Sequence, residues 1–190
     1  MDRSVARIKR VSESAVEPLP GLVAEDHGSE TFEALYRRTF PRVYGYVASL
    51  LQDRAAAEDV TALAFERAYR KRLSFRARRG TAEAWMFGIA RNAALDELRR
   101  RKRRATLEVD PKDADSRTPE EYAELTLRRE VVRAALATLD PRERDLVALK
   151  FSGGLSNAEI ARVLRISESN AGTRLHRTIQ KLREACDDHA

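Results

Sequence analysis

The 190-residue chain has little of the chemistry that builds metal sites, disulfide frameworks or membrane spans. It has one cysteine, Cys186, and therefore neither an internal disulfide nor a cysteine-based zinc cage. Its three histidines are scattered, which argues against a histidine metal site. No stretch approaches the roughly 18 uncharged apolar residues of a transmembrane helix, and no apolar run follows the N-terminal charges as in a secretory signal. We therefore expect a soluble, cytoplasmic protein without metal, cofactor or membrane insertion.

Charge is strongly segregated along the chain. The net charge is +6 at pH 7, but residues 66–104 alone hold 14 basic and four acidic side chains, a net charge of +10. This stretch ends in six consecutive cations at 99–104. Such a block is typical of a surface that binds a polyanion, because neutralising phosphates releases condensed counterions. The alternative is a solvated helix end, whose cations also suit the negative end of the helix dipole.

Apolar residues recur at helical spacing over most of the chain, and no run predicts a strand. Pro41 interrupts the first helical pattern and must kink that helix or divide it in two. The next helix has an expected inner stripe of Ala56, Val60, Leu63, Ala64 and Ala68. We expect helices near 29–51, 53–71, from 81 into the arginine block, 120–138, 141–151, 157–164 and 168–184.

Local capping signals support the helix boundaries. Asp53 and Thr81 can cap the second and third helices, and Asp140 and Ser156 each precede a glutamate at the third helical position. A similar N-cap signal, with proline at the first helical position and glutamate at the third, occurs at Thr118-Pro119-Glu120-Glu121. The pattern predicts an all-α fold with two small helical domains joined by a flexible acidic linker. Its expected parts are a flexible N-terminal extension at 1–28, a first domain at 29–104, the linker at 105–117 and a second domain at 118–186.

The second domain contains a helix-turn-helix pattern. A short helix at 157–164, a tight turn at 165–167 and a longer helix follow one another. On the longer helix one stripe is apolar, and the opposite side carries groups that can bind base edges and phosphates. A helix pair with a polar outer face also occurs in proteins that never touch DNA. The candidate DNA-binding residues are Ser169, Asn170, Thr173, Arg174, His176, Arg177 and Lys181.

The first domain offers residues suited to a single strand. Phe75 and its neighbouring arginines combine one aromatic ring with several cations beside a glycine. Alternatively, Phe75 anchors the core and the arginines are solvated. Trp85 is expected to pack in the core rather than stack on a base, and Asn92 either reads a base or satisfies buried backbone. The candidates are Phe75, Arg76, Arg78, Arg79 and Asn92, with Arg99, Arg100 and Arg103 as phosphate contacts.

The helix before this loop carries a candidate docking face. Phe65 and Tyr69 lie four residues apart, away from the Val60 stripe and on the side of Glu58 and Ala62. Exposed aromatics at this spacing indicate a surface for partner helices. A second core stripe is the alternative.

Together these residues resemble bacterial sigma factors of the extracytoplasmic-function type, group 4 of the sigma-70 family. The resemblance covers roughly residues 30–185. The blocks that resemble the family's second domain are Ala57-Glu58-Asp59-Val60 with Phe65, and Ala84-Trp85-Met86-Phe87-Gly88-Ile89-Ala90-Arg91-Asn92 with Asp96 and Leu98-Arg99-Arg100. Those that resemble its fourth domain are Leu139-Asp140-Pro141-Arg142-Glu143-Arg144, Glu159-Ile160-Ala161 and Thr173-Arg174-Leu175-His176-Arg177.

The resemblance implies a transcription initiation factor that directs RNA polymerase core to promoters and assists their melting. It implies that the first domain binds the −10 element and captures flipped bases of the non-template strand, while its second helix docks on the polymerase clamp coiled coil. The second domain then reads the −35 duplex and binds the polymerase flap, and an anti-sigma factor is an expected partner. The residues carried over to polymerase binding are Glu58, Asp59, Ala62, Phe65 and Tyr69.

The chain departs from the family pattern at three places. Ala62-Leu63-Ala64 stands where polar residues are usual, Gly172 where a basic residue is frequent, and Arg165 where the turn often has glycine. Duplex readout is therefore expected to depend on Thr173, His176 and Arg177.

Two other functions compete with this interpretation. A stand-alone regulator would bind duplex operators through the helix-turn-helix without polymerase, but the arginine block argues against it. A helical enzyme acting on nucleic acid would need cooperating carboxylates, whereas Glu58-Asp59 and Glu120-Glu121 are adjacent pairs that point apart on a helix. No phosphate loop, nucleophile elbow or metal spacing occurs, so the chain is not expected to be an enzyme.

Overall fold

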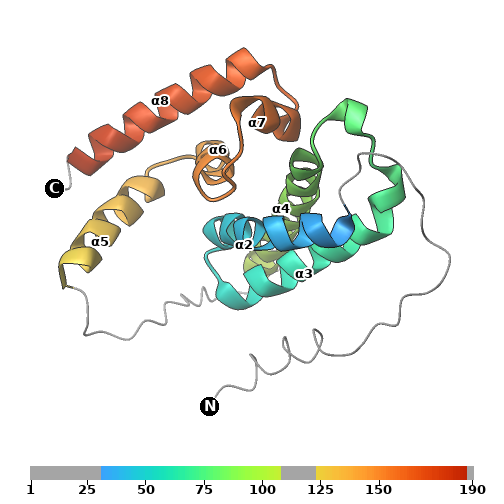
Figure 1. Cartoon of the computed structure of the whole chain (residues 1–190). Coiled ribbons are helices and arrows are strands. Elements are labelled where there is room, and N and C mark those ends of the chain that lie inside the picture. The colour runs from blue at the N-terminus through green and yellow to red at the C-terminus, as the bar shows by residue number, and fades with distance from the viewer. Residues whose placement is uncertain (1–30, 108–122, 188–190) are drawn as a thin grey trace. The chain divides into compact units, whose positions relative to one another are not determined.

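The structure is a computed structural model that describes residues 31–107 and 123–187 (Figure 1). Within these ranges the elements are helical, which confirms the all-α prediction. The extension predicted at 1–28 and most of the predicted linker lie outside the described residues. The linker's first residues, 105–107, belong instead to the end of a helix. The boundaries predicted for the two domains stay a prediction.

The first group of helices consists of α2 (Phe32–Leu51), α3 (Arg54–Lys71) and α4 (Ala82–Leu107), which pack against one another (Figure 1). Pro41 lies inside α2 and does not divide it. Asp53 caps α3 by accepting a hydrogen bond from the Ala56 N–H at 3.0 Å, and Thr81 accepts one from the Ala84 N–H at 3.1 Å. Two short 3₁₀ turns, η1 (Arg72–Ser74) and η2 (Ala77–Arg79), connect α3 to α4. Both predicted caps are confirmed.

The inner face of α3 differs from the predicted stripe. Val60, Ala64 and Ala68 are buried as expected, but Leu63 is 38% exposed. The buried face instead extends to the other side of the stripe and takes in Ala57, Thr61 and Phe65. Alanine-rich sequence gives a weak amphipathic signal, because several faces of the helix are nearly equal in apolar content.

The second group consists of α5 (Ala123–Ala137), α6 (Pro141–Phe151), α7 (Asn157–Leu164) and α8 (Glu168–Asp187). Asp140 with Glu143 and Ser156 with Glu159 form complete capping boxes at α6 and α7, as predicted. The cap predicted at Thr118 lies outside the described residues. Helices α7 and α8 pack on each other, which confirms the helix-turn-helix, and α8 also contacts α5 and α6.

The two groups share one hydrophobic core in the described part of the chain. Tyr46 and Phe87 from the first group and Leu149, Leu155 and Ile160 from the second belong to the same buried cluster, and each is at most 1% exposed. The rings of Tyr46 and Phe87 pack edge to face with centroids 5.6 Å apart. Contacts of α4 with α7 and of α2 with α6 continue this core between the groups.

Arg165 ends α7 in a conformation that suits glycine. Its φ is 57° and its ψ is 47°, and its N–H donates to the carbonyls of Ala161 and Arg162. A side chain in this left-handed region costs about 1 kcal/mol. Arg165→Gly is therefore expected to raise the free energy of unfolding by about 0.5–1 kcal/mol, measured by urea denaturation followed by circular dichroism.

Arg162→Gly is the matched control, because Arg162 lies inside α7 in helical conformation. Glycine there is expected to lower the free energy of unfolding by about 1 kcal/mol. Equal effects of the two substitutions would contradict the explanation from backbone conformation.

Candidate nucleic-acid interface

The η1–η2 loop presents an aromatic pair with cations around it. Phe75 and Trp85 are both half-buried, and their ring centroids lie 5.4 Å apart at an interplanar angle of 50°. Trp85 packs against the core, as predicted, and it also lines a cleft together with Phe75, Arg76, Arg79 and Asn92. Asn92 is exposed, so its amide does not serve buried backbone. The arrangement offers stacking surfaces and positive charge, the two things that bind a single strand.

The cleft has a second wall from the helix-turn-helix. Arg162, in the last turns of α7, and Arg165, in the turn, also line it. Its volume is about 780 Å³. The side chain of Arg162 passes so close to Gly80 that a Cβ at Gly80 would lie 2.9 Å from the Arg162 Cδ. Residues predicted for the −10 element thus share one cleft with two arginines of the helix-turn-helix that were not predicted to bind DNA.

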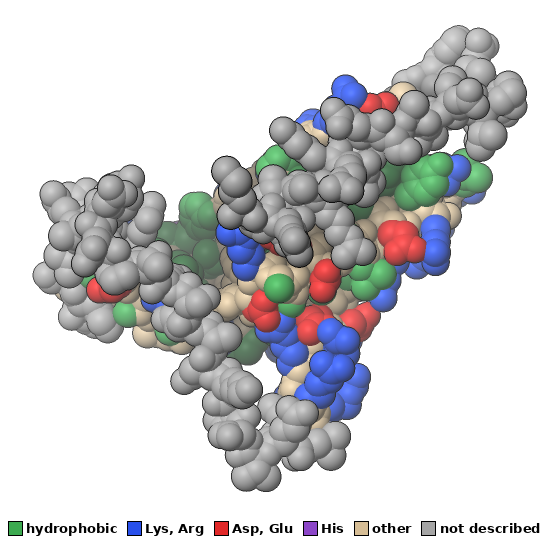
Figure 2. Space-filling view, turned by 90° about the horizontal axis from the view of Figure 1, so that it is seen from below, with side chains coloured by type: hydrophobic (Ala, Val, Ile, Leu, Met, Phe, Trp, Pro, Cys, Tyr) green, Lys and Arg blue, Asp and Glu red, His purple; other side chains and the backbone are tan. Residues whose placement is uncertain are grey.

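Arginines at the end of α4 divide into two sets. Arg99, Arg100 and Arg103 are exposed, as their predicted phosphate contacts require. Arg101 is turned inward: it donates to Glu97 at 3.0 Å and to Asp53 at 2.8 Å. Figure 2 shows Lys and Arg side chains gathered on one projecting part of the molecule, with Asp and Glu side chains at its base.

The recognition helix α8 is oriented as its sequence pattern predicts. The stripe at Ala171, Leu175 and Thr178 is buried, and the opposite side faces solvent. Lys181 is half-buried, and its ammonium pairs with the Glu143 carboxylate at 2.8 Å. The exposed candidates are Ser169, Asn170, Thr173, Arg174, His176 and Arg177.

The docking face predicted on α3 needs one correction. Phe65 is 5% exposed and packs against Tyr36 and Phe40 from α2, with ring centroids 4.8 and 5.7 Å away. The aromatic surface is therefore formed by α2 as well as α3. Tyr69 is 51% exposed, as predicted, and its ring packs against Phe32 at 5.3 Å. The i, i+4 spacing indicates an aromatic face but not which of its rings the neighbouring helix covers.

The other three side chains predicted for this face differ in their solvent exposure. Asp59 and Ala62 are exposed, whereas Glu58 is half-buried. The Glu58 carboxylate accepts a hydrogen bond from Arg54 at 3.2 Å. Two of the three are therefore open to a partner helix.

Sequence reasoning missed a buried polar contact between the two helical groups. Asp145 on α6 is 4% exposed and accepts a hydrogen bond from the Tyr46 hydroxyl at 2.7 Å and one from the Arg91 Nε at 2.7 Å. Tyr46 and Arg91 come from α2 and α4, 99 and 54 positions away in the sequence. No local pattern signals a pairing over such separations.

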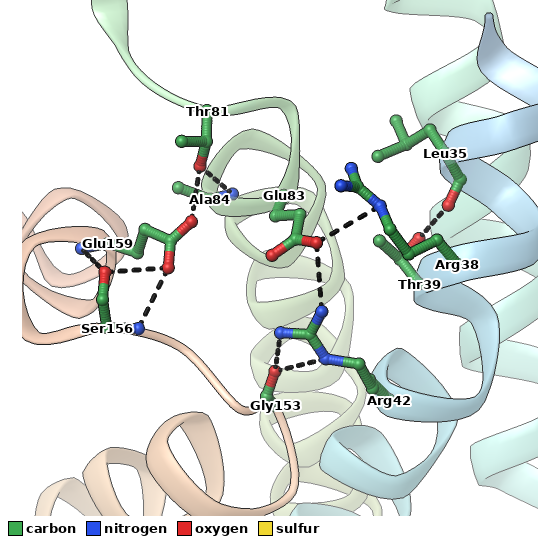
Figure 3. A network of polar contacts seen from close by, with 10 residues as sticks. All are labelled: Leu35, Arg38, Thr39, Arg42, Thr81, Glu83, Ala84, Gly153, Ser156 and Glu159. Atoms are coloured by element: carbon green, nitrogen blue, oxygen red, sulfur yellow. Dashed lines mark hydrogen bonds and ion pairs between the residues drawn. The ribbon is translucent and has the colours of Figure 1, made fainter. Parts of the chain in front are cut away.

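A second set of contacts surrounds the loop after α6 (Figure 3). The Arg42 guanidinium donates to the Gly153 carbonyl at 2.8 Å and pairs with Glu83 at 3.0 Å. The Thr81 hydroxyl donates to the Glu159 carboxylate at 2.8 Å. Each contact joins the first group to a different segment of the second, so the two groups are joined at three places by polar side chains.

Shifted pKa values keep the Tyr46 hydroxyl protonated and the Glu159 carboxyl ionised, the states in which they make these hydrogen bonds. Burial raises the pKa of the Tyr46 hydroxyl well above its ordinary value, and the adjacent Asp145 carboxylate raises it further, so the hydroxyl remains a donor. Partial burial raises the pKa of the Glu159 carboxyl, but hydrogen bonds from the Ser156 N–H and the Thr81 and Ser156 hydroxyls outweigh it and lower the pKa overall. The stabilisation from Glu159 is therefore present at neutral pH and is lost as the pH falls through the lowered pKa.

The described residues contain no cluster of three or more His, Cys, Asp or Glu side chains that could hold a metal ion. Within the same residues, no helix has the length and apolar content needed to cross a membrane.

Two protein-family models match the chain. The model of Sigma-70 region 2 matches residues 35–104, and the model of Sigma-70 region 4 matches residues 129–182. The first range holds the cleft's aromatic pair and the cationic end of α4, and the second holds the helix-turn-helix.

Characterised relatives align along most of the chain. The RNA polymerase sigma factor CarQ of Myxococcus xanthus is 35% identical over 164 residues, which cover 84% of this chain and 91% of CarQ. The ECF RNA polymerase sigma factor BldN of Streptomyces coelicolor is 30% identical over 165 residues, 85% of this chain, but the match spans 62% of BldN.

Solved structures share the fold. The sigma factor RpoE from Bartonella quintana, in complex with the anti-sigma factor NepR, superposes with a TM-score of 0.68 and 23% identity over 82% of this chain and 96% of that one. CnrH in complex with the cytosolic domain of CnrY gives a TM-score of 0.62 and 24% identity over 84% and 89% of the two chains.

Proposed function

This chain belongs to the sigma-70 family and is an RNA polymerase sigma factor of the extracytoplasmic-function type, and we propose which of its surfaces meets each partner. The first helical group holds a separated strand of the −10 element and docks on the polymerase clamp. The second group reads the −35 duplex through α8 and binds the polymerase flap. The polymerase supplies the catalysis.

The Phe75–Trp85 pair is the observation that carries this proposal. Two half-buried rings 5.4 Å apart, with Arg76 and Arg79 on the same cleft, suit unpaired bases and their phosphates. Base pairs in a duplex bury the faces that such rings would stack on. A regulator that binds only duplex operators has no use for this arrangement, and the stand-alone alternative is not favoured.

Polymerase binding is assigned to the aromatic surface of α2 and α3. Tyr69 and Tyr36 are 51% and 40% exposed, and they pack on Phe32 and Phe65 respectively. An exposed aromatic cluster of this kind marks a protein-binding surface rather than a solvated face. Asp59 and Ala62 lie on the same helix and complete the assignment.

An anti-sigma factor is the second protein partner that we propose. RpoE, whose fold this chain shares, is described in complex with the anti-sigma factor NepR, and CnrH in complex with the cytosolic domain of CnrY. Such a partner would cover surfaces that the polymerase needs.

In vitro transcription with bacterial core polymerase tests the proposal. The purified chain, freed of any inhibitor, is incubated with core enzyme and a library of promoter fragments, and transcripts are sequenced. We expect co-elution with core and initiation from promoters that share −10 and −35 elements. A chain that neither co-elutes with core nor supports initiation contradicts the assignment, and footprinting of a duplex by the chain alone would favour the stand-alone regulator.

Arg177→Ala is expected to weaken recognition of the −35 element. Arg177 is exposed on the polar side of α8, where a guanidinium can bind guanine edges or a phosphate. Loss of a base contact reduces affinity about 10- to 100-fold and relaxes specificity at one base pair. Titrating polymerase holoenzyme against promoters with single −35 substitutions measures both effects.

Arg37→Ala is the control for this variant, because Arg37 is exposed on α2 and pairs only locally with Glu33. It removes the same charge and is expected to leave the −35 preference intact. If the two variants behaved alike, Arg177 would have no role in reading the −35 element.

A further inference from the structure

We propose that the cleft lined by the η1–η2 loop and the helix-turn-helix is also a binding site for a free purine nucleoside polyphosphate. The purine stacks on Phe75 and Trp85, and arginines from both walls of the cleft bind the phosphates. The inference deepens the proposed function and rests on it at one point, the stacking role of the aromatic pair. It adds a small-molecule ligand that the chain binds in the absence of polymerase.

Positive charge lines this cleft without carboxylates to balance it. Among the described residues that line it there is no Asp or Glu, but there are five arginines: Arg76, Arg79, Arg91, Arg162 and Arg165. Of these five, only Arg91 forms an ion pair with a described residue, Asp145. Like charges gathered in this way repel one another, and an anion with several charges removes the repulsion. Guanidinium groups bind phosphate oxygens through paired N–H···O bonds, so a polyphosphate suits this lining.

The loop arginine Arg76 is already held in position for such a ligand. One of its terminal nitrogens donates to the carbonyls of Leu73 and Phe75, at 2.8 and 3.0 Å. These two bonds use one end of the guanidinium and fix its direction beside the aromatic pair. A donor that is fixed before binding loses less conformational entropy when the ligand arrives.

One face of α4 provides a surface for the base. Trp85, Gly88, Ile89 and Asn92 all line the cleft, as residues three, four and seven positions apart on a helix should. A Cβ added at Gly88 would meet nothing within 4 Å, so the surface between Trp85 and Asn92 is open to a flat ring. A purine has the larger stacking area, and an asparagine amide can pair with the N6 and N7 edge of adenine. The face therefore favours a purine, and adenine in particular.

The shape of the cleft suits a free nucleotide. Its volume of about 780 Å³ lies within the roughly 300–1,000 Å³ typical of small-molecule sites. Helix α7 packs beside α4 (Figure 1), and Arg162 contacts Gly80 at the end of the η1–η2 loop. The two walls therefore meet on that side. A continuous DNA strand must enter and leave the cleft, whereas a nucleotide needs only one opening.

The two ligands differ in which walls they need. Both use the aromatic pair and the loop arginines, so a bound nucleotide excludes the −10 strand. Only the nucleotide uses Arg162 and Arg165, which belong to the helix-turn-helix. Substitutions at these two positions therefore separate nucleotide binding from strand binding.

Fluorescence of Trp85 tests the site directly, because Trp85 is the only tryptophan in the chain. The full chain without polymerase is titrated with ATP at about 0.1 M salt, and free N-acetyltryptophanamide corrects for absorption by the nucleotide. We expect saturable quenching with half-saturation at about 0.1 mM. CTP, and inorganic tripolyphosphate measured by displacement of ATP, are each expected to bind about tenfold more weakly, because each lacks the purine. Tripolyphosphate that binds as tightly as ATP overturns the proposal, since the base would then contribute nothing.

The double variant Arg162→Ala with Arg165→Ala tests the second wall. Both side chains are exposed, and the variant is expected to bind ATP about tenfold more weakly. Binding of a single-stranded −10 oligonucleotide by polymerase holoenzyme should not change. Arg37→Ala with Arg70→Ala is the control, because these arginines pair only with glutamates on their own helices and their loss removes the same charge. Equal ATP affinities of the two double variants refute the second wall.

Gly88→Leu blocks the base without removing any cation. Leucine favours the helix more than glycine does, and its Cβ enters open space, so circular dichroism should show a chain at least as stable as wild type. Quenching by ATP is expected to weaken about tenfold or more, because the added side chain covers the surface on which the base lies. A folded Gly88→Leu protein that binds ATP like wild type contradicts the proposal.

The same measurements keep this proposal separate from the proposed function. A chain that ATP quenches saturably but that does not bind core polymerase supports the nucleotide site and contradicts the proposed function. A chain that binds core and the −10 strand but shows no quenching by ATP overturns the nucleotide site and leaves the proposed function intact.

Discussion

Gly153→Ala is expected to lower the free energy of unfolding by about 3 kcal/mol, the largest stability effect of any small substitution that we propose. A Cβ at this position would lie 2.6 Å from the Leu149 carbonyl oxygen and 2.9 Å from the Phe87 Cε1. The carbonyl belongs to the backbone of α6 and the ring is fully buried, so neither can move aside cheaply. Urea denaturation followed by circular dichroism measures the loss.

Gly172→Ala is the control, because its added methyl group meets nothing closer than the Asn157 Nδ2 at 3.6 Å. Gly172 lies inside α8, where alanine is favoured over glycine, so a gain of about 0.5–1 kcal/mol is expected. A Gly153→Ala protein as stable as wild type would mean that the loop after α6 does not lie against Phe87.

Removing three loop cations together is expected to reduce single-strand binding about 100-fold at 0.1 M salt. Arg76, Arg78 and Arg79 are all exposed around the Phe75–Trp85 pair. Each phosphate contact to a single strand contributes about 0.7 to the slope of log affinity against log salt concentration. The triple alanine variant should therefore lower the magnitude of that slope by about 2, measured with polymerase holoenzyme and a fluorescent single-stranded −10 oligonucleotide.

A charge-matched variant separates this local effect from the loss of net charge. Arg37, Arg54 and Arg70 are exposed, and each pairs with a glutamate four residues away on its own helix. Replacing these three by alanine removes the same charge but is expected to change the salt slope little. If both triple variants weakened binding equally, the loop would act only through the overall field of the protein.

Local structure was largely predictable from the sequence, because capping depends on residues within one turn. Asp140 and Ser156, each followed three residues later by glutamate, mark the starts of α6 and α7, and both capping boxes are present. The buried stripe of α8 likewise follows from apolar residues repeated over several turns. These signals hold irrespective of what the rest of the chain packs against.

Features that depend on distant segments were predicted less well. For Phe65 the sequence left an exposed docking face and a second core stripe both open, and only the position of α2 decides that its ring is covered. Trp85 packs against the core as expected, but its contact with Phe75 of the η1–η2 loop and its place in the cleft were not predicted. Asp145 lies in a highly charged run that reads as a solvated helix face, and its partners are 54 and 99 residues away. Sequence periodicity describes one helix at a time and contains no information on such pairings.

The hydrophobic core shared by the helical groups determines what can be learned from isolated fragments. Leu149, Leu155 and Ile160 are covered in part by a cluster that Tyr46 and Phe87 help to form. A fragment that contains only the second helical group exposes these apolar side chains to water. It is therefore expected to self-associate more readily than the intact chain. Affinities measured on such halves report the behaviour of an incomplete folding unit, and the two halves are not interchangeable modules.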